Sequence, residues 1–246
     1  MSILVLGGSK GIGLEIAKAF AGKDEQVFIN YRGDDNAANR AADDIKALGG
    51  VCTLIKMDAS TPEGCADIIR QVEGQTDRLN QIVHCAVDPY ATTVLDADPA
   101  KFADAVSLNG LSLLYIVQAA QNLLAQGSTV FFLTSRGGRM VVDNYASIGV
   151  SKALAESLVR YLAVELASKG IRINCIAPGI VQTGAVETVF GENAGNLVAE
   201  SDRKNPSGRG VRAADYTSMM KYLASPEAEY ITGQTIFING GANLHA

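Results

Sequence analysis

The sequence predicts one α/β domain, built as a doubly wound parallel sheet of about seven strands with helices on both faces. Two observations support this prediction. Short apolar runs rich in Val and Ile alternate with longer amphipathic patterns along the chain, and strands that are each followed by a helix imply a parallel sheet covered on both sides. No Pro/Ser-rich linker or charge run divides the chain. We therefore treat 1–246 as a single domain.

The predicted elements follow one another in a regular order. The strands are the short apolar runs Ile3–Leu6, Val27–Asn30, Val51–Ile55, Gln81–Cys85, Thr129–Leu133, Arg172–Ile176 and Thr235–Ile238. Helical patterns lie between them near 12–22, 34–48, 62–74, 99–125, 144–168 and 212–224. The stretch 184–205 has little strand signal, and its place before the last large helix predicts a mobile substrate flap over a pocket.

Composition excludes several classes of function. The chain is 48% hydrophobic and 19% charged, as in a soluble globule, and its net charge of −5 without a basic tract argues against a nucleic-acid partner. No apolar run approaches about 20 residues, and no charged leader precedes the first strand, so we expect no membrane span and no signal peptide. The cysteines show no paired spacing and the chain has two histidines, which predicts no metal and a reduced, cytoplasmic protein: Cys52, Cys65, Cys85 and Cys175.

The first functional motif is GGSKGIG, at 7–13, directly after the first strand and at the start of the first helix. In this context Gly7 permits a tight turn, Gly11 lets the backbone approach a pyrophosphate, and Gly13 allows close helix–strand packing. The helix N-terminus adds N–H donors and a positive dipole. The motif predicts dinucleotide binding in a Rossmann-type domain, and a plain strand–helix turn is the alternative.

The end of the second strand indicates which dinucleotide is bound. An NAD site places Asp or Glu there, whereas this chain has Asn30, Tyr31 and Arg32, with Lys10 in the glycine loop. Two cations and no carboxylate suit a 2′-phosphate, so the predicted cofactor is NADPH. Ordinary surface cations are the alternative. Asp58, which closes the third strand, is either a partner of the adenine amine or a loop residue.

The stretch from Ser135 to Lys152, SRGGRMVVDNYASIGVSK, brings together side chains that can act on a substrate. Tyr145 and Lys152 are seven residues apart, which on a helix leaves them about 20° apart and two turns along the axis. A nearby cation favours the phenolate and makes Tyr145 a better proton donor. The alternative is an aromatic residue at a helix start and a solvated lysine.

Several motifs together resemble the short-chain dehydrogenase/reductase superfamily over essentially the whole chain. They are GGSKGIG, Asn109 in SLNG, Ser135, Lys152 in GVSKALAESL, Pro178-Gly179 followed by Thr183, and the closing GQTIFINGG. The resemblance implies a single Rossmann-type domain that uses NAD(P)H and is usually tetrameric. Apolar helical surfaces at 111–124 and 153–166 also favour a homotetramer.

The resemblance assigns a role to each site residue. Lys152 would hold the nicotinamide ribose and Thr183 the carboxamide. Ser135 would bind the substrate oxygen, and Asn109 a water on the proton path. Asn109 could instead be a polar helix residue, and Thr183 a loop cap. The predicted cofactor contacts are Gly7, Ser9, Lys10, Gly11, Ile12, Gly13, Tyr31, Arg32, Asp58, Ala59, Cys85, Ala86, Lys152, Pro178, Gly179, Val181 and Thr183.

The chain departs from the common pattern of this superfamily at two places. The usual tyrosine, four residues before the lysine, is Ile148, so Tyr145 is the available phenol. Tyr followed by six residues and Lys resembles the enoyl-acyl-carrier-protein reductases, in particular the type III (FabL-like) enzymes. His84-Cys85-Ala86-Val87 replaces Asn-Asn-Ala-Gly, and a histidine there resembles the type I (FabI-like) enoyl reductases. We otherwise expect His84 to be a buried structural histidine without a catalytic role.

These observations predict an NADPH-dependent enoyl thioester reductase of fatty acid biosynthesis. Moving the phenol one helical turn displaces it by about 4.5 Å, which suits hydride delivery to C3 with charge developing on the thioester oxygen at C1. Tyr145 would stabilise the enolate, and Lys152 would lower the pKa of the phenol. We expect the acyl thioester to be carried by acyl carrier protein. The alternatives are a 3-ketoacyl-acyl-carrier-protein or other carbonyl reductase, and a non-catalytic NADP-binding protein.

Three residues around this stretch have open roles. Gly149 inside the helix costs about 1 kcal/mol relative to Ala, which indicates close approach of cofactor or substrate, or simple backbone slack. Arg136 and Arg139 lie in the turn before the helix. They are surface cations or contacts for an acidic carrier protein, and we favour the former.

Overall fold

A computed structural model describes residues 1–242 of the chain and confirms the predicted fold class. Seven strands form one sheet in the order β3-β2-β1-β4-β5-β6-β7, and every neighbouring pair is parallel. All predicted strands are present: β1 (Ser2–Leu6), β2 (Gln26–Tyr31), β3 (Val51–Lys56), β4 (Gln81–His84), β5 (Thr129–Leu133), β6 (Arg172–Pro178) and β7 (Thr235–Ile238).

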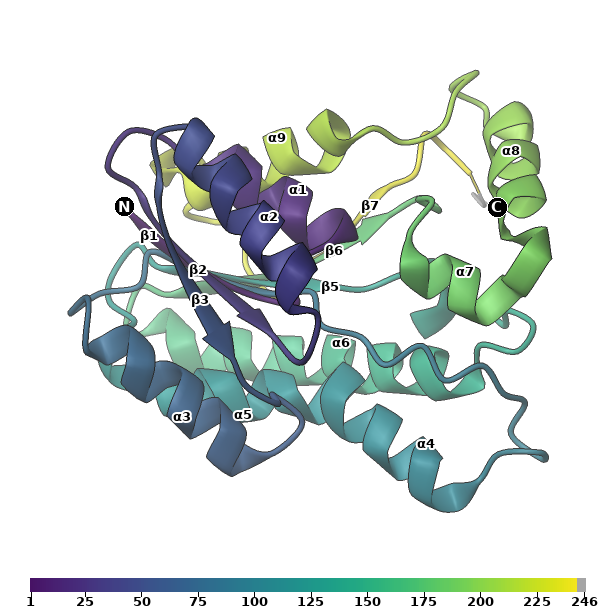
Figure 1. Cartoon of the computed structure of the whole chain (residues 1–246), viewed down its shortest axis with the longest axis horizontal. Coiled ribbons are helices and arrows are strands. Elements are labelled where there is room, and N and C mark those ends of the chain that lie inside the picture. The colour runs from purple at the N-terminus through teal and green to yellow at the C-terminus, as the bar shows by residue number, and fades with distance from the viewer. Residues whose placement is uncertain (243–246) are drawn as a thin grey trace.

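Helices cover both faces of the sheet (Figure 1). One face carries α1 (Gly11–Phe20), α2 (Asp35–Ala47) and α9 (Ala213–Ala224), which is followed by a 3-10 turn, Pro226–Ala228. The other carries α3 (Pro62–Glu73), α4 (Pro99–Val106), α5 (Ser112–Ala119) and α6 (Ala146–Ala167). This arrangement is the Rossmann-type domain that the alternating pattern predicts.

The buried strands divide the interior into two hydrophobic cores. In β1 every residue is buried, and successive side chains point to opposite faces. Leu4 and Leu6 therefore join the core under α3, α5 and α6, while Ile3 and Val5 join the core under α1, α2 and α9. Burial on both faces explains why the strands are nearly continuous apolar runs.

The predicted helix near 99–125 is not continuous. After α4 the chain forms a π-helix, Ser107–Leu111, then α5, and then a 3-10 turn, Ala120–Asn122. The stretch Pro99–Asn122 has the length and apolar composition of a membrane-crossing helix. A single helix of this kind is weak evidence for a span, because the core helix of a globular protein passes the same test. Its apolar residues Leu113, Ile116 and Val117 are buried in the core.

The predicted flap at 184–205 contains no strand and consists of α7 (Gly184–Phe190), a 3-10 turn (Gly191–Asn193) and α8 (Ala194–Lys204). Thr183 begins α7 by accepting a hydrogen bond from the Val186 amide with its side-chain oxygen. Such capping depends on local chemistry and needs no strand signal. The mobility of this segment stays a prediction.

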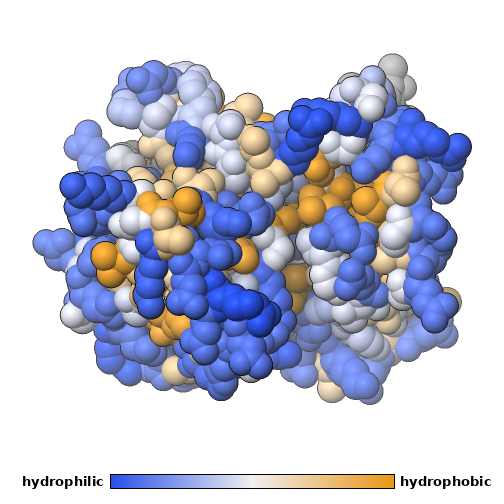
Figure 2. All heavy atoms as spheres, turned by 45° about the horizontal axis from the view of Figure 1, so that its top comes forward, coloured by the Kyte–Doolittle hydropathy of each residue, from blue (hydrophilic) through white to orange (hydrophobic). Residues whose placement is uncertain are grey.

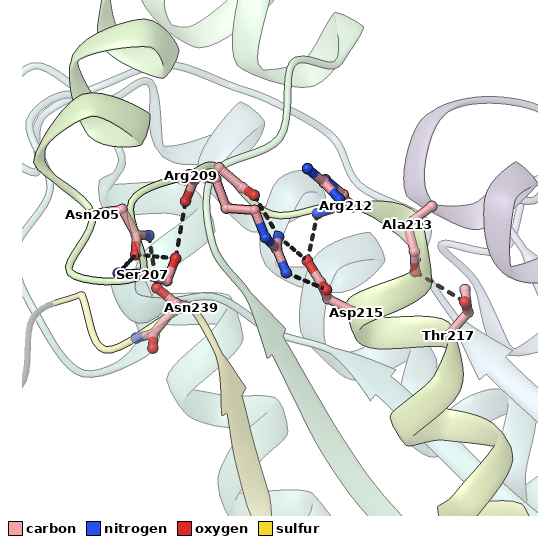
Figure 3. A network of polar contacts seen from close by, with 9 residues as sticks. Asn205, Ser207, Arg209, Arg212, Ala213, Asp215, Thr217 and Asn239 are labelled. Atoms are coloured by element: carbon pink, nitrogen blue, oxygen red, sulfur yellow. Dashed lines mark hydrogen bonds and ion pairs between the residues drawn. The ribbon is translucent and has the colours of Figure 1, made fainter.

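The chain beyond α8 is tied to the end of the sheet by the polar network in Figure 3. Asn205 donates to the main-chain oxygen of Asn239, after β7, at 2.9 Å. Arg209 donates to both carboxylate oxygens of Asp215 at 2.6 and 2.8 Å. The hydrogen bond from Arg209 is the main reason that the pKa of Asp215 is lowered to about 2. The flap therefore ends at an anchored segment.

Candidate active site

The turn after β1 has the backbone geometry of a dinucleotide-binding loop. Gly7 has φ 73° and Gly11 φ 53°, a region that side chains rarely adopt. A Cβ on Gly7 would lie 2.7 Å from the Cα of Ala86, and one on Gly13 2.3 Å from the Gly7 carbonyl. The first turn of α1 is thereby pressed onto the strand end, with its amide groups at the crevice between β1 and β4. That crevice is where open α/β sheets bind dinucleotides, so the residues present fit a nicotinamide cofactor.

The loops after the other central strands border the same crevice. Thr183 approaches the glycine loop, since a Cβ on Gly11 would lie 3.3 Å from its Cγ2. The amide of Cys85 donates to the Leu6 carbonyl at 2.9 Å, and that of Gly179 to the Ile238 carbonyl at 2.9 Å. The predicted contacts from these loops therefore gather at the carboxyl edge of the sheet: Cys85, Ala86, Pro178, Gly179, Val181 and Thr183.

The region predicted for the 2′-phosphate contains a carboxylate that the sequence pattern did not predict there. Lys10 Nζ lies 2.6 Å from Asp34 Oδ2, and Asp34 Oδ1 caps α2 by accepting from the Ala37 amide at 2.9 Å. The hydrogen bond from Lys10 is the main reason that the pKa of Asp34 is lowered. A hollow beside this pair is lined by Ser9, Lys10, Gly11, Leu14, Asp34, Ala37, Arg40 and Asp44. Arg40 on α2 is therefore a further cation, besides Lys10 and Arg32, near the predicted site of the 2′-phosphate.

The remaining predicted contacts at the ends of β2 and β3 differ in their engagement. Tyr31 Oη donates to Asp35 Oδ1 at 2.9 Å, and Lys56 Nζ lies 2.7 Å from the other Asp35 oxygen. Asp58 Oδ1 accepts from the Ser60 amide at 2.8 Å, which is the loop role considered for it. Within residues 1–242, Arg32 is exposed and has no hydrogen bond or ion pair, so its guanidinium is available to a ligand.

Tyr145 and Ser135 lie together at the start of α6. Ser135 Oγ and Tyr145 Oη are 3.4 Å apart. Tyr145 is not inside the helix, however, because α6 begins at Ala146 and Tyr145 is its N-cap, with φ −113° and ψ 14°. Its carbonyl accepts from the Gly149 amide at 2.7 Å, so it still begins the first turn. A parallel bridge to Thr92 holds its main chain.

The environment of the phenol corrects one expectation. Burial raises the pKa of Tyr145, and the hydrogen bond with Ser135 and the charge of Arg136 oppose that rise. Lys152 is not among the groups that shift it. The expectation that Lys152 lowers the phenol pKa is therefore wrong for this structure. The protonated phenol is the stable form at neutral pH, which is the form that donates a hydrogen bond.

Lys152 is a buried cation on the second turn of α6. Its side chain is 5% exposed, and Nζ lies 4.5 Å from the centroid of the Phe132 ring. Burial lowers the pKa of Lys152 to about 8. Within residues 1–242 the ammonium makes no hydrogen bond, so its donors are available to a bound group. This is a suitable state for holding the hydroxyls of a ribose.

Asn109 lies in the π-helix and is fully buried. Its Oδ1 accepts from the Asp88 amide at 2.6 Å, and its Nδ2 donates to the Asp88 carbonyl at 2.9 Å. These bonds fix the segment after β4 and occupy both ends of the side chain. One N–H donor and one oxygen lone pair of the amide group remain for a further partner.

The two departures from the common pattern are both buried. Ile148, where carbonyl reductases of the superfamily keep a tyrosine, is 1% exposed. His84 Nε2 lies 2.5 Å from Ser112 Oγ, which itself donates to the Leu108 carbonyl at 2.6 Å. His84 is thus the donor, and burial lowers its pKa to about 3. The interpretation of His84 as a structural histidine agrees with this arrangement.

The turn before α6 gives Gly149 and Arg139 defined roles. A Cβ on Gly149 would lie 2.7 Å from the Gly137 carbonyl, so this glycine admits the turn rather than a ligand. Arg139 Nε donates at 2.8 Å to Glu156 Oε2, and its guanidinium lies over the Phe237 ring. Arg139 is therefore a structural cation. Glu156 was not among the predicted site residues, because the resemblance assigns a role only to Lys152 within the stretch GVSKALAESL.

Comparison with known proteins shows the family. Residues 7–243 match the family model described as enoyl-(acyl carrier protein) reductase. The chain belongs to this family of short-chain dehydrogenases/reductases, and it is accordingly an oxidoreductase. The family match confirms the resemblance seen in the motifs.

Individual relatives differ in what they reduce. The chain is 28% identical to a 1-cyclohexenylcarbonyl-CoA reductase of Streptomyces collinus, over 99% of this chain and 87% of the relative. It is also 28% identical to the 3-oxoacyl-[acyl-carrier-protein] reductase FabG of Staphylococcus aureus, over 98% and 97%. The solved enoyl-[acyl-carrier-protein] reductase (NADH) of Aquifex aeolicus superposes with a TM-score of 0.87 at 25% identity, over 100% of this chain and 97% of that one. Two other similar structures hold NADP, so a nicotinamide cofactor is supported.

Proposed function

We propose that this protein is an NADPH-dependent enoyl thioester reductase. The observation that carries the proposal is the position of the phenol. Tyr145 Oη faces Ser135 Oγ at 3.4 Å from the start of α6, while the position one turn closer to Lys152 is filled by the buried Ile148. Tyr145 therefore lies one helical turn further from Lys152 than the tyrosine of a carbonyl reductase would. This position suits a reaction in which negative charge develops on the thioester oxygen at C1 while C3 receives the hydride.

The chain's own groups would divide the reaction as follows. Bound NADPH supplies the hydride for C3 of the enoyl thioester. Lys152 would hold the ribose of the cofactor, and the glycine loop and the start of α1 would hold its pyrophosphate. Tyr145 donates its hydrogen bond to the thioester oxygen at C1, where the negative charge of the enolate collects, with Ser135 orienting the phenol. A proton from solvent would then add to C2 of the enolate, and the saturated thioester would leave.

A hollow near the flap offers a place for the acyl chain. Figure 2 shows hydrophobic surface gathered in a hollow on the right of the view, the side on which α7 and α8 lie in Figure 1. An apolar lining with a few polar groups is typical of a site for an acyl group. We propose that α7 and α8 form the substrate flap and that the thioester is presented by acyl carrier protein in the cytoplasm.

The preference for NADPH rests on Arg32, Lys10 and Arg40 near the end of β2. Asp34 opposes it, because its carboxylate already pairs with Lys10. We propose that the 2′-phosphate takes over Lys10 while Asp34 keeps its cap on α2. The hollow also contains Asp44, which lies 4.0 Å from Lys18 Nζ, so three cations face two carboxylates that both have a cationic partner, and this balance favours a phosphate.

A second candidate is a 3-ketoacyl thioester reductase. The FabG relative favours it, with the same 28% identity as the CoA reductase and 97% of its own length covered. In that reaction Tyr145 would protonate the ketone oxygen at the carbon that receives hydride. Both candidates share the thioester substrate and the cofactor, so the distinction lies in the bond that is reduced.

The test measures NADPH consumption with crotonyl and acetoacetyl thioesters side by side, each carried by CoA and by acyl carrier protein. Turnover of the crotonyl thioester alone supports the proposal. Turnover of the acetoacetyl thioester alone assigns the chain to the carbonyl reductases, and turnover of neither identifies a cofactor-binding protein without this activity. Tyr230→Phe, which removes a fully exposed hydroxyl outside the site, is the matched control for Tyr145→Phe.

A further inference from the structure

A buried carboxylate lies one helical turn beyond the buried lysine of the site. Glu156 is on α6, four residues after Lys152, and its side chain is 4% exposed. Residues at this spacing are neighbours on one helix face, about 6 Å apart between Cβ atoms. Acidic side chains are rarely buried unless they are paired, so the position of Glu156 requires a physical reason.

Two donors hold the Glu156 carboxylate in a defined place. Thr134, at the end of β5, donates its hydroxyl to Oε1 at 2.8 Å, and Arg139 donates Nε to Oε2 at 2.8 Å. The turn 135–139 packs directly on this carboxylate, since a Cβ on Gly138 would lie 2.9 Å from Oε1. Glu156 thus links α6 to the turn that begins with Ser135. Arg139 itself is 49% exposed, so solvent screens its charge more than it screens the carboxylate.

The other titratable groups around Lys152 are neutral at physiological pH. His84 on β4 has a pKa of about 3, and the thiols of Cys85 and Cys175 have pKa values of about 11 and 12. All three are shifted mainly by burial, and all interact with Lys152. The remaining group that acts on Lys152 is Glu156. Within residues 1–242, Glu156 is therefore the anionic group that favours the charged form of the Lys152 ammonium. The ammonium also lies over the face of the Phe132 ring.

We propose that Glu156 is a positioning residue that keeps Lys152 protonated and holds the Ser135-containing turn against α6. The proposal rests on the proposed role of Lys152 in binding the cofactor. It does not depend on whether the enzyme reduces an enoyl or a ketoacyl thioester. A neutral lysine would lose the charge-assisted hydrogen bonds to the ribose, which are stronger than neutral ones.

The sign of the effect follows from the charges. Burial lowers the pKa of Lys152, and the negative charge of Glu156 raises it again toward its normal value. Replacing Glu156 by Gln keeps the shape and an acceptor for Thr134 but removes that charge. Lys152 then loses its proton at a lower pH than in the wild type. Between the lower midpoint of the variant and about pH 8, Lys152 is protonated to a greater extent in the wild type than in the variant.

The experiment measures the titration of Lys152 directly. The purified protein is labelled with a trace of acetic anhydride over a range of pH, and acetylation of the Lys152 peptide is measured by mass spectrometry. We expect Glu156→Gln to move the labelling midpoint to lower pH by about one unit, which corresponds to roughly ten-fold more neutral amine below pH 8. Glu73→Gln, which removes an exposed carboxylate at the end of α3, should keep the wild-type midpoint.

A second variant, which should shift the Lys152 midpoint in the opposite direction, tests the proposal if Glu156→Gln does not fold. Arg139→Gln leaves the carboxylate in place and removes the cation that offsets it, so the Lys152 midpoint should move to higher pH. An unchanged or lower midpoint in this variant overturns the proposal, as does a wild-type midpoint in folded Glu156→Gln. NADPH binding followed by fluorescence should weaken above each new midpoint. Labelling is independent of turnover, so a failure of the proposed activity leaves this test intact.

Discussion

Gly149→Ala is a demanding test of how the site is packed. Gly149 lies in the first turn of α6, where alanine is the better helix former. The structure predicts the opposite effect on stability, because the new Cβ would lie 2.7 Å from the Gly137 carbonyl. That oxygen belongs to the main chain of the turn that follows Ser135, so it cannot move without moving the turn.

The magnitude can be worked out from two opposing contributions. Replacing a helical Gly by Ala stabilises a protein by about 0.5–1 kcal/mol when space is available. An ordinary contact needs about 3.4 Å or more, so the turn must shift by roughly 0.7 Å, and overpacking of this kind typically costs about 1–3 kcal/mol. We therefore expect a net loss of about 0.5–2 kcal/mol, or a few degrees in Tm for a domain of this size. Displacement of Ser135 should also lower turnover by roughly ten-fold or more.

The assay is urea unfolding followed by circular dichroism, combined with the enoyl reductase assay. Gly74→Ala is the matched control, since Gly74 ends α3 away from the site with φ −67°, and a Cβ added there would lie 3.6 Å from the nearest atom, an ordinary contact. The control should be as stable as the wild type or more stable, with full turnover. If Gly149→Ala were stabilised to the same extent and kept its activity, the account of the turn packing on α6 would be refuted.

The remaining predictions concern the proton donor, the cofactor and the assembly. Tyr145→Phe should retain fold and NADPH binding and lower enoyl reductase turnover by about 10²–10³-fold, because one positioned donor is lost; full activity would show that another group stabilises the charge. Arg32→Ala should weaken NADPH binding by roughly ten- to a hundred-fold and leave NADH binding nearly unchanged, as measured by fluorescence titration; equal losses for both cofactors would contradict the NADPH assignment. We expect a homotetramer by light scattering, with Tyr161→Glu and Val164→Glu together reducing the mass, because both side chains are exposed on α6 beside a groove formed with α5; a monomeric wild type at micromolar concentration would exclude this assembly.

The sheet and the glycine loop could be predicted because their determinants are local. A buried parallel strand needs a short run of β-branched and apolar residues, and each strand meets that requirement within its own sequence. The turn after β1 needs glycines at fixed offsets, since Gly7 and Gly13 have no room for a side chain. The spacing of seven residues between Tyr145 and Lys152 is also a local property of the sequence, and it places both residues at the beginning of α6.

Tertiary contacts decided the features that could not be predicted or were placed wrongly. The helix pattern near 99–125 contains a π-helix whose Asn109 binds the main chain of Asp88, a residue from an earlier loop. Asp34 reaches Lys10 only because β1 and β2 end side by side. The pKa of Tyr145 depends on its burial and on Ser135, and not on the spacing to Lys152.

The pairing of Glu156 with Arg139 and Thr134 is of the same kind. Its three members come from a helix, a turn and a strand end. Glu156 lies in the stretch GVSKALAESL, but nothing in that stretch indicates that its side chain meets Arg139 and Thr134. Sequence periodicity can predict that a side chain such as Glu156 faces the interior, but it cannot predict which charged or polar groups will surround it there. That information arises only when the folded chain removes water from the groups and leaves each buried charge dependent on its neighbours.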